Sequence, residues 1–360
     1  MSPVFIAFVC YTRITLLIRR QKGSMTIDKL IKLQQVLSGY ENILILPHND
    51  PDPDAIGASV GLRYLLMEKF KLDVQIAYQG MIGRAENKAL VRYLNLPLQK
   101  LSRHKISPNT PVALIDTQPG SGNNPLADNI PASIVIDHHP LRDSTLAVPF
   151  SDIRPEIGAS STILTQYLRA TELEIPSFLA TALFYGIKTD TMGLGRGASR
   201  DDVDAYFFLQ TRIDVDDLVK IEHAQVPEGY FKSLTSAIQS TSIYEQDLVI
   251  AYLGSMEYPD LGAEIADLLL RLQGAKWVIC MGVYQGDFIL SIRSRSQKIG
   301  AGKLVRRIVG ELGSAGGHGT MAGGQIELKN QDPIRLFDQI SKRALEVIKG
   351  HVSIEGSPLI

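Results

Sequence analysis

A carboxylate and two imidazoles follow one another directly at the end of an apolar run. Residues 133–136 (SIVI) have the pattern of a buried strand, and Asp137, His138 and His139 come immediately after it. Asp and His side chains bind manganese, magnesium or zinc, and a histidine can also carry a proton. Neighbouring residues of an extended chain point to opposite sides, so we expect the two imidazoles to have different roles.

Three further groups of the same residue types follow predicted strands or a predicted helix. Their members are His48, Asp52, Asp54, Asp116 and Asp190. The strands of a parallel sheet all end at one edge, and ligands bind in the crevice beyond that edge. We therefore expect the four groups to converge on one site, although they are far apart in the sequence.

The candidate ligands number six or seven, which is more than one ion needs. A pair of ions is therefore the natural interpretation. Two ions about 3.5–4 Å apart can clamp a phosphoryl group and lower the pKa of a bridging water. One carboxylate must then bridge the two ions. Each group taken alone has an ordinary alternative, which is a turn and a helix cap for the first aspartates and a solvated loop for the paired histidines.

The elements that must position these residues alternate between apolar runs and segments of helical period. Strands are predicted at residues 42–46, 73–78, 111–115 and 133–136, and helices at 55–70, 160–169 and 177–186. Alternation of this kind requires crossover connections. It predicts an α/β domain with a mostly parallel, doubly wound sheet that is covered by helices.

A smaller α/β domain with a mixed sheet is predicted after a helical connector. The pattern predicts a strand at 248–253, a helix through 265–272, a hairpin of 277–284 and 288–292, a helix at 303–312, a glycine-rich loop at 313–324, a strand at 325–328 and a helix at 333–349. The predicted boundaries are 25–205 for the metal-binding domain, 206–243 for the connector and 244–350 for the second domain.

Bulk composition narrows the classes of function. The 360 residues include 37 basic and 38 acidic side chains, a balance that argues against binding long nucleic acid through charge alone. Two cysteines provide no disulfide framework and fit the reducing cytoplasm, where we expect the protein. Residues 1–24 contain an apolar run that is short and broken by Arg13. We interpret them as an upstream extension and expect no membrane anchor.

Residues 313–324 (GSAGGHGTMAGG) contain six glycines around one histidine. Their exposed N–H groups would permit close approach of a phosphate. An arginine and a serine end a predicted strand upstream, and a planar guanidinium suits phosphate binding. The predicted substrate-binding residues of this domain are Arg293, Ser294, Gly316, Gly317 and His318.

Together, these motifs resemble the DHH phosphoesterase superfamily, which is named for the triplet found here at residues 137–139. The first family motif, His-x-x-Pro-Asp-x-Asp-x-x-Gly, corresponds to His48, Pro51, Asp52, Asp54 and Gly57. The aspartates of the second and fourth motifs correspond to Asp116 and Asp190. The glycine-rich segment resembles the Gly-Gly-Gly-His loop of the DHH-associated C-terminal domain, with Ala315 in place of the first glycine.

The resemblance implies a role for each candidate ligand. His48 and Asp52 would hold one ion, Asp54, His138 and Asp190 would hold the other, and Asp116 would bridge them. His139 would face the scissile phosphate. His139 and the bridging Asp116 are therefore the expected catalytic residues. From its position, we also expect Asp137 to orient an imidazole from behind. Two Mn²⁺ ions are the expected cofactor, with Mg²⁺ or another divalent ion as alternatives.

The resemblance points to the branch of nanoRNases and pAp phosphatases. It implies two-metal-dependent hydrolysis of phosphoester bonds in very short oligonucleotides and in 3'-phosphonucleotides such as pAp. Arg196, in a run that departs from the family pattern, could bind phosphate. The alternatives are a phosphodiesterase for cyclic or linear dinucleotides, an exopolyphosphatase or pyrophosphatase, and an inactive nucleotide-binding regulator. Long duplex nucleic acid and membranes are not expected as partners, and a homodimer is one option.

Overall fold

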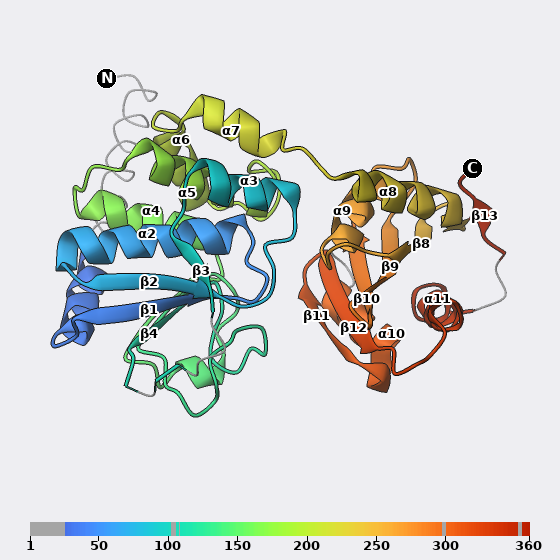
Figure 1. Ribbon diagram of the computed structural model, residues 1–360, viewed down its shortest axis with the longest axis horizontal. Helices are drawn as coiled ribbons and strands as arrows, with labels where there is room; N and C mark the ends of the chain where they lie inside the picture. The colour runs from blue at the N-terminus through green and yellow to red at the C-terminus, as the bar shows by residue number, and fades with distance from the viewer. Residues whose placement is uncertain (1–25, 102–105, 108, 297–299, 352–354) are drawn as a thin grey trace, which may run out of the picture. The chain divides into compact units, whose positions relative to one another are not determined.

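In the computed structural model, the described residues are 26–101, 106–107, 109–296, 300–351 and 355–360. They form two compact units, divided between Ala224 and Gln225 (Figure 1). The predicted extension, residues 1–24, lies outside the described residues. Within the described ranges, no helix combines the length and the apolar character needed to cross a membrane.

The first unit is built on a six-stranded sheet in which every strand pair is parallel. Its strands are β1 (Asn42–Pro47), β2 (Asp73–Tyr78), β3 (Leu98–Lys100), β4 (Val112–Ile115), β5 (Ile134–Asp137) and β6 (Phe150–Ile153). Their order is β3-β2-β1-β4-β5-β6, so the chain winds outward from β1 in one direction and from β4 in the other. A sheet of this order binds ligands where the direction changes, between β1 and β4. The predicted α/β fold is confirmed.

Helices cover one face of this sheet. The helices of this unit are α2 (Pro53–Phe70), α3 (Ala85–Tyr93), α4 (Ser160–Ala170), α5 (Ser177–Asp190), α6 (Arg200–Gln210) and α7 (Val215–Glu222), and a helix that includes residues 26–37 precedes β1. A short 3₁₀ turn, η1 (Asp143–Thr145), follows β5. Ile45 and Ile136 belong to the same buried core as apolar residues of α2, α4 and α5. Their neighbours Leu46 and Val135 face the other side and pack against connecting segments, as the alternation of side chains along a strand requires.

Two glycines allow α2 and α5 to approach each other closely. A Cβ atom at Gly57 on α2 would lie 2.7 Å from the carbonyl oxygen of Ala182 on α5, and one at Gly186 on α5 would lie 3.0 Å from Cα of Asp54 on α2. Any larger residue would push the helices apart. The close approach brings the start of α2 beside the end of α5, at the edge where β1, β4 and β5 end.

The second unit contains a seven-stranded mixed sheet. Its strands are β7 (Ser242–Tyr244), β8 (Leu248–Ser255), β9 (Trp277–Tyr284), β10 (Asp287–Ser294), β11 (Ser314–His318), β12 (Met321–Glu327) and β13 (Ser357–Pro358), and its helices are α8 (Glu228–Ser240), α9 (Leu261–Leu269), α10 (Ala301–Val309), η2 (Gly310–Leu312) and α11 (Pro333–Lys349). The order is β11-β12-β10-β9-β8-β7-β13, and β8 and β9 form its parallel pair. The predicted mixed sheet and the hairpin of β9 and β10 are confirmed.

The prediction of a glycine-rich loop at 313–324 is wrong. Most of this segment forms β11 and the first half of β12, paired antiparallel. The glycines serve packing: a Cβ at Gly302 on α10 would lie 1.9 Å from the carbonyl oxygen of Gly317, which itself has φ +145°. A Cβ at Gly316, by contrast, would meet nothing within 4 Å. The sequence analysis attributed these glycines to a phosphate-binding loop. The close approach of α10 to the hairpin of β11 and β12 explains part of the glycine content instead.

The predicted connector, residues 206–243, is helical over most of its length and falls on both sides of the division between the units. α6 and α7 belong to the first unit, and α8 belongs to the second, where it packs against β8. The domain boundaries expected at residues 205 and 243 stay predictions.

Candidate metal centre

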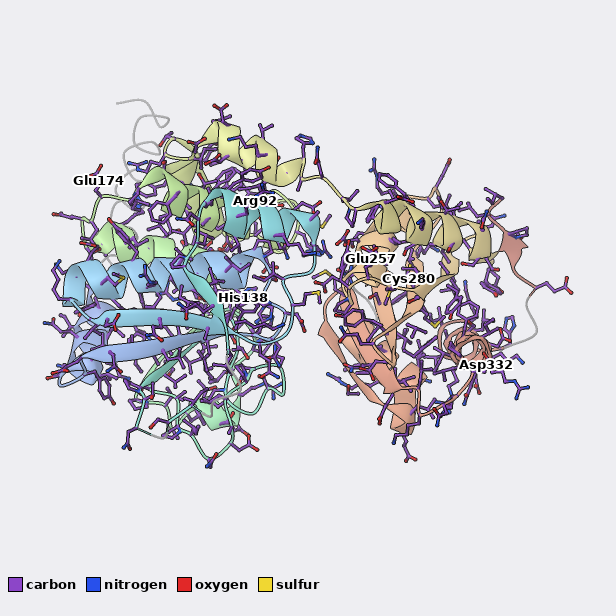
Figure 2. All side chains as sticks on the ribbon, in the orientation of Figure 1. Arg92, His138, Glu174, Glu257, Cys280 and Asp332 are labelled. Carbon is purple, nitrogen blue, oxygen red and sulfur yellow. The ribbon has the colours of Figure 1, made fainter. Side chains whose placement is uncertain are left out.

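All six predicted ligands lie at the C-terminal edge of the parallel sheet or at the helix ends beside it. They form groups whose ligand atoms lie within 4.8 Å of one another: His48, Asp52 and Asp116; Asp54, His138 and Asp190; and Asp116, His138 and His139. Figure 2 marks His138 at the ends of the strands. Asp116 lies between the first two groups, since it belongs to one and contacts the histidine of the other.

His48 follows β1, and its ring is held by the backbone. Its Nδ1 lies 2.8 Å from the carbonyl oxygen of Asn49, so Nδ1 carries the proton and Nε2 faces the carboxylates. Nε2 is 3.5 Å from Oδ2 of Asp116 and 3.7 Å from Oδ1 of Asp52. Asp52 is the N-cap of α2, where its Oδ1 accepts a hydrogen bond from the N–H of Ala55 at 3.0 Å. The helix start thus fixes this carboxylate.

His138 is oriented in the same way. Its Nδ1 lies 3.1 Å from the carbonyl oxygen of Ile157, which turns Nε2 toward two carboxylates. Nε2 is 3.4 Å from Oδ1 of Asp116 and 3.2 Å from Oδ2 of Asp190, the last residue of α5. Both imidazoles therefore present Nε2 to the cluster, because a backbone carbonyl occupies Nδ1 in each.

The start of α4 holds two of the carboxylates. Asp54 is fully buried, and its two oxygens accept hydrogen bonds from the backbone N–H groups of Ser160 at 2.6 Å and Ser161 at 2.8 Å. The hydroxyl of Ser160 donates to Oδ1 of Asp116 at 3.0 Å. The backbone of Asp116 has a φ of 57°, in the left-handed region that is uncommon away from glycine and is found at constrained sites.

His139 has a different environment from His138. Its Nδ1 lies 2.8 Å from Oδ1 of Asp137, whose other oxygen accepts a hydrogen bond from the amide of Gln118 at 2.7 Å. The side chain of His139 is 33% exposed, against 11% for His138, so this ring is the more accessible of the two. Burial lowers the pKa of His139, but the bond to Asp137 and the charges of Asp116 and Asp137 together outweigh it and raise that pKa above its usual value.

Four carboxylates crowd around two imidazoles in this cluster. Burial disfavours a charged imidazole, yet the carboxylates of Asp52 and Asp116 outweigh it and raise the pKa of His48 to about 10. Against the same effect of burial, Asp116 and Asp190 raise the pKa of His138 to about 10. Burial, and then the charge of Asp52, raises the pKa of Asp190 to about 7. Without cations, the site therefore takes up protons to offset its negative charge.

This donor set fits two divalent cations. Four carboxylates carry at most four negative charges, which two divalent ions would balance without protons on the histidines. Carboxylate oxygen and imidazole nitrogen suit Mn²⁺, Mg²⁺ or Zn²⁺. His48 and Asp52 would hold one ion, Asp54, His138 and Asp190 would hold the other, and Asp116 lies where a bridging ligand would be needed.

Two residues that organise the site were not among the sequence candidates. Gln118 holds Asp137, and its position two residues after Asp116 in the same strand-end segment was an available signal. Ser160 bonds both Asp54 and Asp116 from the start of α4. No local pattern marks Ser160, because the fold alone brings it to carboxylates so distant in sequence.

The predicted phosphate-binding arginines are engaged with protein groups in the structure. The guanidinium of Arg196 donates to the carbonyl oxygen of Asp190 at 2.9 Å. Nε of Arg293 donates to Oδ1 of Asp267 on α9 at 2.7 Å, and the side chain of Arg293 is buried. The hydroxyl of Ser294 donates to the carbonyl oxygen of Ser296 at 3.2 Å. Their roles in binding substrate stay predictions.

The remaining candidates of the second unit lie on one hairpin. Gly316 and Gly317 belong to β11, where they pair with Gly323 and Ala322. His318 pairs with Met321, and the side chain of His318 lies outside what the structure describes. Register therefore brings Arg293, which also pairs with Met321, to the same row of the sheet as residue 318.

Comparison of the sequence with protein families gives two matches, one in each of the two units. The DHH family, N-terminal domain, matches residues 42–187, and the DHHA1 domain matches residues 245–350. The chain belongs to the DHH phosphoesterase superfamily. Its DHH match contains every predicted metal ligand except Asp190, which ends α5 just beyond it.

Relatives of this DHH protein extend over most of its length. An uncharacterized protein of Methanocaldococcus jannaschii is 33% identical over 302 residues, or 84% of this chain and 60% of that protein. The cyclic-di-AMP phosphodiesterase GdpP of Bacillus subtilis is 24% identical over 312 residues, or 82% of this chain and 46% of that protein. This chain thus spans about half the length of these relatives. The crystal structure of an exopolyphosphatase-related protein from Bacteroides fragilis shares the fold, with a TM-score of 0.70, 16% identity, and coverage of 89% of this chain and 97% of that one.

Proposed function

We propose that this DHH protein uses two divalent cations, foremost Mn²⁺, to hydrolyse phosphoester bonds in short nucleotides. The proposed substrates are very short oligoribonucleotides and 3'-phosphonucleotides such as pAp. The observation that supports this most is the pair of ligand groups joined by Asp116. When bound, two ions so arranged would act as Lewis acids and lower the pKa of a water between them.

Residues of the chain would position the ligands and contact the substrate. Asp116, held by Ser160, keeps the two ligand groups at a fixed separation. His48 and His138 keep Nε2 turned inward, because their Nδ1 atoms donate to backbone carbonyls. His139, with its proton at Nδ1 directed to Asp137, would present its opposite edge to a phosphate oxygen or a leaving group.

Cyclic dinucleotides form a second class of candidate substrate. The observation that favours them is the likeness to a cyclic-di-AMP phosphodiesterase over 82% of this chain. The ligand set gives no preference between a linear and a cyclic phosphodiester, because either would bring one scissile phosphate to the ions. Substrate choice must therefore be tested directly.

The experiment is a substrate panel with purified protein that is first freed of metal and then supplied with Mn²⁺. Release of mononucleotide from diadenylate (pApA) and of phosphate from pAp is expected with Mn²⁺ and is lost with EDTA. Turnover of cyclic di-AMP in preference to both would favour the second class. No turnover of any of the three, with Mn²⁺ bound, would contradict the proposal.

A further inference from the structure

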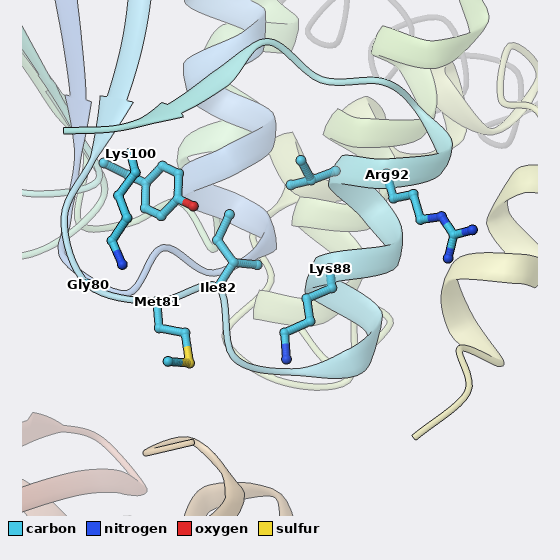
Figure 3. A pocket seen from close by; sticks show the side chains of 8 residues that line it. Gly80, Met81, Ile82, Lys88, Arg92 and Lys100 are labelled. Carbon is cyan, nitrogen blue, oxygen red and sulfur yellow. The ribbon is translucent and has the colours of Figure 1, made fainter. Parts of the chain in front are cut away.

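A separate pocket lies in the first unit, one strand away from the metal ligands. It has a volume of about 290 Å³ and is formed by the end of β2, the segment after it, α3 and the end of β3 (Figure 3). Three basic side chains, Lys88, Arg92 and Lys100, line it, and none of its described lining residues is acidic. The chain as a whole has a net charge of −1, so general basicity does not explain this grouping.

The pocket is tied to the loop that carries the first metal ligands. The backbone N–H of Met81 donates to Oδ1 of Asp50 at 2.7 Å, and the N–H of Asp50 donates to the carbonyl oxygen of Gln79 at 3.0 Å. Asp50 stands between His48 and Asp52. Because β1 and β2 are neighbours, the pocket and the first metal ligands follow adjacent strands at the same edge of the sheet.

Its lining combines cations with an apolar surface. Tyr78, Met81 and the buried Ile82 line the pocket, and the exposed Lys88 and Lys100 reach it from α3 and β3. In Figure 3, the guanidinium of Arg92 points away from these two lysines, so we assign the anion to Lys88 and Lys100. Ammonium groups bind phosphate, and an aromatic and aliphatic surface accepts a base or a sugar.

The size of the pocket limits the ligand. Pockets for small molecules begin at roughly 300 Å³, so the size of this one suits a single nucleotide unit. We propose that it binds one nucleoside monophosphate unit of the substrate, next to the unit whose phosphate reaches the metal centre. This inference rests on the proposed hydrolysis of short nucleotides and names the part of the chain that would hold their second residue.

The test compares the double variant Lys88→Glu, Lys100→Glu with the wild type. Lys69→Glu, an exposed reversal in the last turn of α2 and on the order of 25 Å along the helix from the metal ligands, is the matched control. KM and kcat are measured with pApA and with bis(p-nitrophenyl) phosphate, a small diester with no nucleotide unit. AMP binding is measured by calorimetry in EDTA, where metal makes no contribution.

The double variant should raise KM for pApA by about tenfold more than it raises KM for the small diester, roughly threefold for each lysine. AMP binding should weaken by a similar factor, and the control should match the wild type in both assays. Equal effects on the two diesters together with unchanged AMP binding would overturn the pocket assignment. If the wild type hydrolyses neither diester, the proposed function fails, while the AMP measurement still decides whether the pocket binds a nucleotide.

Discussion

The metal centre and the glycine-rich hairpin carry the two densest motifs of the sequence, yet they differ in what fixes them. In the metal centre, each side chain is held by a specific partner, such as the carbonyl of Asn49 for His48 or the N–H groups of α4 for Asp54. In the hairpin of β11 and β12, the described contacts are mostly backbone pairing and close packing against α10. The first region is therefore specified by polar groups that need partners, and the second by the room that glycine leaves.

The sharpest way to break this comparison is to remove the shared carboxylate. Asp116→Asn should lower kcat/KM roughly a thousandfold or more, because an amide neutralises the ligand common to both groups and several kcal/mol of charge stabilisation is lost. Bound Mn²⁺, counted by plasma mass spectrometry after desalting, should fall below two per chain.

The control is Asp73→Asn, an exposed aspartate at the opposite end of the sheet, which should leave both quantities unchanged. Full activity and two bound ions in Asp116→Asn would show that Asp116 is not the bridge.

The second prediction concerns stability and the two central glycines of β11. Gly317→Ala should destabilise the second unit by about 2–3 kcal/mol, because its φ is +145° and the added Cβ would lie 2.4 Å from the carbonyl oxygen of Met321. Gly316→Ala meets open space and should change stability by less than about 0.5 kcal/mol. Trp277, the single tryptophan and a residue of the same sheet, reports urea unfolding.

Equal destabilisation by the two alanines would mean that packing does not explain the glycine content. A large loss of pApA hydrolysis in Gly316→Ala at unchanged stability would instead assign Gly316 to substrate binding.

A smaller effect on activity is expected from replacing Asp137, which holds the ring of His139. Asp137→Asn should lower kcat about 10–100-fold while two Mn²⁺ ions stay bound, because the side chain of Asp137 contacts His139, which is not one of the six predicted metal ligands. Asp137 raises the pKa of His139, so its loss lets the imidazole deprotonate at lower pH. The alkaline limb of the kcat profile should then move to lower pH, and a profile that is merely scaled down would argue for a structural role alone.

The smallest effect is expected for the stability of the metal-free protein as a function of pH. Without metal, bound protons offset the negative charge of the cluster. His48 and His138 have pKa values raised from 6.5 to about 10, so the stabilisation they provide is complete below pH 6.5 and disappears as pH rises toward 10. Asp190, raised from 3.8 to about 7, acts in the same direction at lower pH, since the folded state holds a proton that the unfolded chain has lost.

The melting temperature of metal-free protein should therefore fall steadily between pH 6.5 and pH 9.5. Saturating Mn²⁺ should remove that decline, and the affinity for Mn²⁺ should rise over the same range as the histidines lose their protons. A melting temperature that is independent of pH without metal would contradict the assigned shifts.

The sequence predicted the first unit well because its signals are local and periodic. Apolar runs marked β1, β4 and β5, and the rule that parallel strands end at one edge predicted that residues as distant as His48 and Asp190 would meet. The edge strands β3 (LQK) and β6 (FSDI) were missed, since polar residues interrupt both and neither contains an apolar run like those of β4 and β5.

The glycine-rich segment was harder to predict because glycine has no side chain whose pattern could distinguish a strand from a loop. Only the neighbours of Gly317, which are α10 and Met321, show why it must be glycine. A partner such as Ser160 was likewise beyond reach, because serine is an ordinary residue until the fold places it beside a carboxylate. Sequence thus predicted which residues meet at this site better than it predicted the groups that hold them.

The most direct measurement is the anomalous scattering of manganese in a crystal of the protein grown with Mn²⁺. Two peaks about 3.5–4 Å apart are expected, one beside His48 and Asp52 and the other beside Asp54, His138 and Asp190, with Asp116 in contact with both. A single peak, or two peaks that Asp116 does not join, would contradict a binuclear centre in this chain.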